Sequence, residues 1–298
     1  QYEQAIQNCD EAIRLDPQNA IAYYNRGVVY DHLVEDERSK QDYDEAIRLN
    51  PQYRDAYNNR GLAYGGKGEL DKAISDYIRA IELEPSYAEA YNNRGIAHGS
   101  TGDVTKALLD FTRAIKLQPN YPEAYNNRGF ALAKKGDYDA AISDYTKAIE
   151  LDPNYADAHN NRASAYGQKG EFDNAIRDYT RTIELVPSHA RAYKNRGIAH
   201  GQKGEFDKAI RDYTKTIELD PNYATAYINR SVAYYHKRDY ARARADVTRA
   251  QALGQKVDPR FLTDLGKAAL PSPRNELLFF DRGVAYVQKG EFDKAIHE

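Results

Sequence analysis

An arginine and an aspartate recur together along this chain, and their types and constant separation point to shared chemistry. A guanidinium group matches a carboxylate in a bidentate geometry. Each pair could therefore bind an anion from a partner or join two segments of the chain. We predict the second role, because an anion site would not need its own counter-ion every time. The predicted ion pairs join Arg60 to Asp76, Arg94 to Asp110, Arg128 to Asp144, Arg162 to Asp178 and Arg196 to Asp212.

An asparagine stands immediately before each arginine of this series. Adjacent helical residues point about 100° apart, so the asparagine can face outward if the arginine faces a paired helix. A side-chain amide donates and accepts, and it can pair with the backbone of an extended peptide without reading its side chains. The alternative is a hydrogen bond within the helix pair or to water. The candidate peptide-binding residues are Asn25, Asn59, Asn93, Asn127, Asn161, Asn195 and Asn229.

Residues arranged for catalysis are not evident. Gly65-Gly66-Lys67-Gly68 lacks the spacing of a phosphate-binding loop. His98 and His200 fall in a column otherwise filled by tyrosine, which predicts core packing, and no histidine cluster has metal-ligand spacing. We therefore predict no catalytic residue, no metal site, no cofactor and no enzymatic activity.

Prolines that recur every 34 residues reveal the elements that position these side chains. They are Pro17, Pro51, Pro85, Pro119, Pro153, Pro187 and Pro221. A constant period of this size indicates a stacked repeat array. In one period, residues 90–99 and 105–117 show helical apolar spacing, with a Gly-containing break between them. Each unit is thus predicted to be two helices, with the asparagine and arginine on the first and the aspartate on the second.

Several columns of one unit carry a resemblance to a known family. The unit supplies Tyr57, Gly61, Tyr64, Ala73, Tyr77, Ala80 and Pro85, and this pattern resembles the tetratricopeptide repeat. The resemblance implies an all-α, right-handed superhelical solenoid of antiparallel helix pairs, with first helices lining a concave groove. The asparagine column is similar to one that holds extended peptides in O-linked N-acetylglucosamine transferases. Lys194 matches part of a carboxylate clamp, and is added to the peptide-binding candidates, but Ile198 departs from that clamp.

Four acidic residues begin successive first helices, namely Asp55, Glu89, Glu123 and Asp157. Negative charge is favourable at a helix N-terminus, which is one explanation for them. If they also face the groove, they favour basic segments in a partner. Arg191 and Lys194 then reverse the sign further along the chain.

The period also sets the expected domain boundaries. Residues 1–19 are predicted to be the second helix of a truncated repeat, and residues 20–256 to be seven complete units. Residues 257–275 are predicted to form a capping helix and linker, followed by a partial eighth unit at 276–298. The chain begins and ends inside units and contains no methionine, so we expect it to be a fragment of a longer protein.

Composition argues against some classes of partner. With 42 basic and 45 acidic residues the net charge is −3. No basic excess is available to neutralise a phosphate backbone, and no nucleic-acid partner is expected. No stretch of about 18 apolar residues suggests a membrane span, and no membrane partner is expected. A single cysteine, Cys9, gives no disulfide framework and favours a cytoplasmic location.

The leading functional prediction is a non-enzymatic scaffold that binds extended segments of a protein or peptide partner in the groove. One alternative is the substrate-recruiting part of a larger enzyme such as a glycosyltransferase. Another is a structural array that associates head to tail, because the incomplete repeats at its two ends could complete one unit between molecules.

Overall fold

The computed structural model describes residues 1–268, which form sixteen α-helices and contain no strand. The first helices of the repeats are α2 (Ala20–His32), α4 (Arg54–Gly66), α6 (Ala88–Ser100), α8 (Pro122–Lys134), α10 (Ala156–Gln168), α12 (Ala190–Gln202) and α14 (Ala224–His236). The second helices are α1 (Tyr2–Leu15), α3 (Asp36–Leu49), α5 (Leu70–Leu83), α7 (Val104–Leu117), α9 (Tyr138–Leu151), α11 (Phe172–Leu185), α13 (Phe206–Leu219) and α15 (Tyr240–Ala252). A shorter helix, α16 (Pro259–Lys267), follows.

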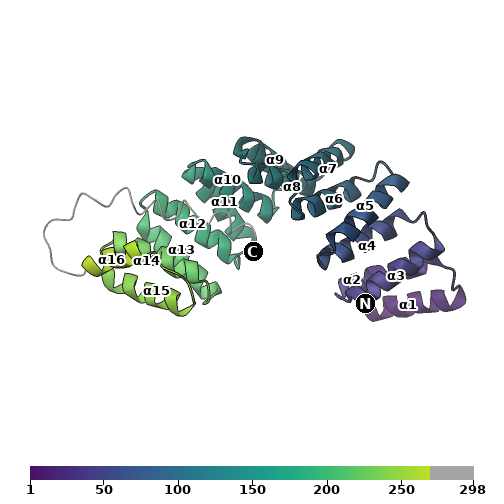
Figure 1. Ribbon diagram of the computed structural model, residues 1–298, viewed down its shortest axis with the longest axis horizontal. Coiled ribbons are helices and arrows are strands. Elements are labelled where there is room, and N and C mark those ends of the chain that lie inside the picture. Colours follow the sequence, from purple (N-terminus) through teal and green to yellow (C-terminus); the bar gives the residue numbers. More distant parts are fainter. Residues whose placement is uncertain (269–298) are drawn as a thin grey trace. The chain divides into compact units, whose positions relative to one another are not determined.

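The chain divides into two compact units, Gln1–Tyr155 and Ala156–Glu298. Within each unit, every first helix packs against the second helix that follows it, and that helix packs against the first helix of the next repeat (Figure 1). The predicted all-α fold of consecutive helix pairs is confirmed.

Small residues recur at equivalent positions of the repeats because the two helices of a repeat pack closely there. A Cβ atom built on Gly61 of α4 would lie 2.6 Å from Cε1 of Tyr77 on α5. Tyr77 is buried, and its cluster includes Ala73 and, on the next repeat, Ala97. This cluster therefore extends from one repeat to the following one within the first unit, so packing inside a repeat and packing between repeats stabilise each other there.

The turn between the helices requires a left-handed residue. Gly102, between α6 and α7, has φ +87°, a conformation that costs glycine little. In the first complete repeat Val34 holds this place with φ +59°. Its helices α2 and α3 nevertheless have 13 and 14 residues, the same lengths as α6 and α7.

The last described helix, α16, packs against α15. Leu265 of α16 is buried in a cluster with Ala243 and Val247 of α15, and Phe261 packs against the same cluster. The rest of the predicted linker and the predicted partial eighth repeat at 276–298 lie outside the described residues.

Candidate functional site: the face of the first helices

The arginines that follow the asparagines contact the aspartates of their own repeats. In the second complete repeat, Nε and Nη2 of Arg60 donate to the two carboxylate oxygens of Asp76 at 2.8 and 2.7 Å. Asp76 is buried, and the Arg60 side chain is 18% exposed. The same bidentate contact joins Arg26 to Asp42, Arg94 to Asp110, Arg128 to Asp144, Arg162 to Asp178, Arg196 to Asp212 and Arg230 to Asp246.

The electrostatics of these pairs favour the charged forms. Burial alone would lower the pKa of Arg60, but hydrogen bonds to Asp76 and Asp44 outweigh it and raise that pKa above its usual value. Burial is the largest single effect on Asp178 and would raise its pKa, but the hydrogen bonds from Arg162 and His159 and the attraction of their charges together outweigh burial and lower that pKa. A guanidinium and a carboxylate that satisfy one another in this way stabilise the helix pair.

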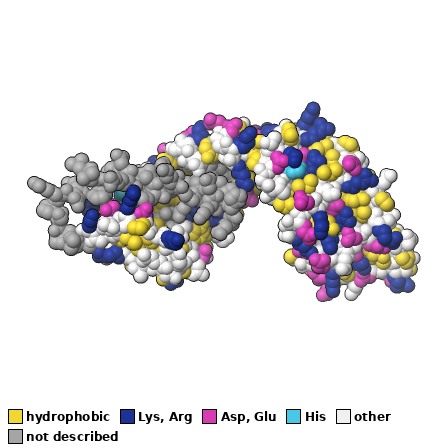
Figure 2. Space-filling model, in the orientation of Figure 1, with side chains coloured by type: hydrophobic (Ala, Val, Ile, Leu, Met, Phe, Trp, Pro, Cys, Tyr) yellow, Lys and Arg dark blue, Asp and Glu magenta, His cyan; other side chains and the backbone are white. Residues whose placement is uncertain are grey.

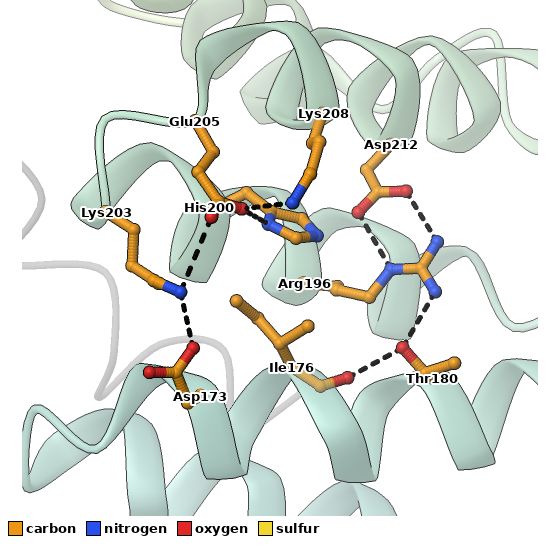
Figure 3. Close-up of polar contacts among 9 residues, drawn as sticks. All are labelled: Asp173, Ile176, Thr180, Arg196, His200, Lys203, Glu205, Lys208 and Asp212. Atoms are coloured by element: carbon orange, nitrogen blue, oxygen red, sulfur yellow. Dashed lines mark hydrogen bonds and ion pairs between the residues drawn. The ribbon is translucent and has the colours of Figure 1, made fainter.

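In several repeats the third nitrogen of the arginine also contacts the preceding repeat, a contact that was not predicted from the sequence. Nη1 of Arg60 donates to Asp44 of α3 at 2.7 Å. Nη1 of Arg196 donates to Oγ1 of Thr180 on α11 at 3.0 Å, and Thr180 in turn donates to the Ile176 carbonyl (Figure 3). The sequence indicates this contact by an Asp or Thr 16 positions before most of the arginines, with Ile78 as an exception before Arg94.

Asparagines of α4, α6 and α8 form a continuous chain of hydrogen bonds. Nδ2 of Asn127 donates to Asn92 at 3.0 Å, and Nδ2 of Asn93 donates to Asn58 at 3.0 Å. Within each repeat, Asn92 donates to Asn93 and Asn58 donates to Asn59, at 3.5 and 3.3 Å. This amide chain consists of Asn127, Asn92, Asn93, Asn58, Asn59 and, as the last acceptor, Tyr24. It links α8, α6, α4 and α2.

The amide chain uses a second asparagine column that the sequence analysis did not consider. Asn58 and Asn92 are buried, whereas Asn59, Asn93 and Asn127 are partly exposed. The sequence shows this second column as a repeated Asn-Asn-Arg triplet, of which the first asparagine is buried in the structure. The amide chain orients the outer asparagines. A primary amide has two N–H groups and two carbonyl lone pairs, so an outer asparagine such as Asn93, which uses one of each in the chain, can form further hydrogen bonds.

The remaining predicted residues occupy different environments. Asn25 is exposed, while Asn161, Asn195 and Asn229 are partly exposed in the second unit. Lys194 is 8% exposed, with Nζ 5.7 Å from the centroid of the Tyr223 ring. Peptide binding by these residues stays a prediction.

An apolar row lies beside the outer asparagines. Leu62 of α4 is 48% exposed and Ile96 of α6 is 45% exposed. Each follows an outer asparagine by three positions and an acidic residue by seven, so all three share one helix face. We name as the first-helix face Asp55, Asn59 and Leu62 of α4, Glu89, Asn93 and Ile96 of α6, and Glu123, Asn127 and Phe130 of α8.

Tyrosines border the acidic end of the first-helix face. The rings of Tyr24 and Tyr53 lie 4.8 Å apart between centroids. Burial raises the pKa of Tyr53 to about 12, helped by Tyr24 and Asp55. Burial also raises the pKa of Tyr121 to about 12, helped by Glu89 and Glu123. The charges of these carboxylates therefore add to the effect of burial on the pKa of both tyrosines.

Acidic and basic side chains intermingle on the visible face of residues 1–155 (Figure 2). Within residues 1–268, no group of three or more His, Cys, Asp and Glu side chains could hold a metal ion. None of the described helices combines the length and apolar character that crossing a membrane requires.

The chain belongs to the tetratricopeptide repeat family. Sequence profiles of the tetratricopeptide repeat match residues 20–53, 122–155, 156–189, 190–223 and 212–245, and a TPR repeat profile matches residues 1–32, 66–102 and 100–136. Proteins of this family are generally interaction scaffolds with protein or peptide partners. No curated protein sequence matches the chain.

Solved structures share the fold. The APC/C hetero-tetramer Cut9–Hcn1 matches with a TM-score of 0.70 at 20% identity over 78% of this chain, which spans only 46% of that chain. MamA matches with a TM-score of 0.51 at 30% identity, over 58% of this chain and 94% of its own. YrrB, described as a TPR protein with an unusual peptide-binding site, matches with a TM-score of 0.51 at 25% identity, over 62% of this chain and 95% of its own.

Proposed function

We propose that this chain is a scaffold without chemistry of its own, which binds an extended peptide segment on the first-helix face. The observation that carries the proposal is the pairing of an oriented amide with an exposed apolar side chain on successive first helices. Asn59 lies one turn from Leu62 on α4, and Asn93 lies one turn from Ile96 on α6. The peptide-binding site of YrrB adds support from a similar protein.

The spacing of the face suits an extended backbone. Packed helices lie about 10 Å apart, and an extended chain advances about 3.3 Å per residue. One repeat therefore serves about three residues of the segment. The outer asparagines supply hydrogen bonds to its backbone, while Leu62 and Ile96 contact its apolar side chains.

The test compares two matched pairs of exposed apolar residues. The first-helix-face variant is Leu62→Ser with Ile96→Ser. The control variant is Ile78→Ser with Leu109→Ser, on the second helices α5 and α7, where these side chains are 40% and 68% exposed. Neither variant removes a buried side chain, so both should keep the helicity and Tm of the parent chain.

Each chain is used to capture partners from a lysate of its source, and captured segments are located by cross-linking and mass spectrometry. We expect the first-helix-face variant to lose a partner that the control variant retains. Cross-links from the first-helix face should be confined to one extended segment of that partner. Equal capture by both variants, or cross-links to the second helices instead, would show that the proposed face is wrong.

A further inference from the structure

We infer that the segment bound on the first-helix face of residues 1–155 is cationic, with lysine or arginine side chains alternating with apolar ones. The inference rests on the proposed function and specifies the class of partner. Alternation matters because successive side chains of an extended segment point to opposite sides. One set can meet the apolar row while the other reaches the acidic end of the face.

The charge of the face is the first observation. Asp55, Glu89 and Glu123 hold equivalent positions on α4, α6 and α8. Glu89 and Glu123 are exposed, and neither forms an ion pair within residues 1–268. Asp55 has Nε of Arg54 at 3.4 Å, but Arg54 also pairs with Glu84. Net negative charge therefore remains along this row.

The rings beside the carboxylates are the second observation. An aromatic face attracts a cation, most strongly where water is partly excluded. The protein already contains one example here, because the guanidinium carbon of Arg54 lies 4.8 Å from the centroid of the Tyr87 ring. Tyr24 and Tyr121 are partly exposed, and burial raises the pKa of each, with a further contribution from the charge of Glu89. A cationic side chain could thus contact a ring and a carboxylate together.

The second unit supplies a contrast. Its residues in the same column are Asp157, Arg191 and Thr225. The negative charge of Asp157 is therefore balanced within that unit by Arg191, whereas the first unit carries three carboxylates in succession. An anionic segment would meet like charges in the first unit, which is unfavourable. The cationic preference should therefore depend on residues 1–155.

The experiment measures binding of three labelled peptides of about nine residues to the full chain by fluorescence anisotropy. In each peptide leucine alternates with one other residue, which is lysine, serine or glutamate. The acidic-row variant is Asp55→Asn, Glu89→Gln and Glu123→Gln. Its matched control, Asp71→Asn, Glu82→Gln and Glu150→Gln, removes the same charge from exposed positions of α5 and α9.

We expect the lysine peptide to bind the parent chain about tenfold more tightly than the serine peptide, since three partly exposed ion pairs together give roughly 1.4 kcal/mol. The acidic-row variant should abolish that difference, and the control should keep it. Added salt should reduce the difference.

Two failures are distinguishable. If lysine, serine and glutamate peptides bind equally, and Leu62→Ser with Ile96→Ser weakens all three, the face binds peptides but the cationic inference is wrong. If Leu62→Ser with Ile96→Ser weakens none of the three, the proposed function fails and the inference fails with it.

Discussion

Nδ2 of Asn93 on α6 donates a hydrogen bond to Oδ1 of Asn58 on α4, 3.0 Å away. This bond joins two repeats at a place where Asn58 is buried and Asn93 is partly exposed. The outer asparagine is therefore part of the stacking interface and also part of the first-helix face on which we propose that a segment binds. Stability and the proposed binding meet at this residue, so the two effects need separate measurements.

Asn93→Ala should lower the free energy of unfolding by about 1–2 kcal/mol, because it leaves the buried carbonyl oxygen of Asn58 without this donor. The measurement is urea denaturation followed by circular dichroism. Asn25→Ala is the control, since Asn25 belongs to the same column but is exposed, and its effect should stay below about 0.5 kcal/mol. Equal effects of the two substitutions would show that the amide chain does not stabilise the stack.

Arg128→Ala and Asp144→Ala should each destabilise the chain by about 3 kcal/mol. The Asp144 side chain is 9% exposed and that of Arg128 is 24% exposed, so removing either partner leaves a largely buried charge. Thermal unfolding provides the measurement. Lys147→Ala breaks only an exposed pair with Glu150, and should change stability by less than about 0.5 kcal/mol. An unchanged Tm in both Arg128→Ala and Asp144→Ala would refute a structural role.

Gly129→Val should destabilise the fourth complete repeat by about 2–3 kcal/mol through overpacking. A Cβ atom at Gly129 would lie 2.8 Å from Cε1 of Tyr145 and 3.2 Å from the Ala141 carbonyl oxygen. Tyr145 is 1% exposed and has no room to withdraw. Gly66→Val, in α4 with no atom within 4 Å, should be neutral or slightly stabilising in the same denaturation experiment. Matching losses from both would contradict the packing explanation.

Glu205 should make stability depend on acid pH. Lys208 and His200 contact its carboxylate at 2.9 and 2.7 Å (Figure 3). The hydrogen bond from Lys208, and then that from His200, lower the pKa of Glu205 from 4.5 to about 2. A carboxylate with a lowered folded-state pKa stabilises the fold above its unfolded pKa and loses that effect as it is protonated. The Tm advantage of the parent chain over Glu205→Gln should therefore be present above pH 4.5 and shrink as pH falls towards 2. An advantage that stays constant down to the lowest pH would contradict this.

The sequence alone determined the repeat, its two helices and the family. Helical spacing and turn residues act over a few positions, so they can be read directly along the chain. The Arg60–Asp76 contact could also be anticipated, because the two helices of one repeat must pack antiparallel across a short turn. The row of acidic residues at the starts of first helices was visible as a column too.

Only the tertiary structure decided what joins one repeat to the next. The amide chain through Asn58 and Asn93, the third contact of Arg60 with Asp44, and the burial of Lys194 all arise where neighbouring repeats stack. A periodic sequence shows which residues occupy equivalent positions, but the rotation and separation of adjacent repeats set which of those side chains meet. Hydrogen bonds are lost within an ångström of misplacement, so these partners follow from the packed geometry and not from the period.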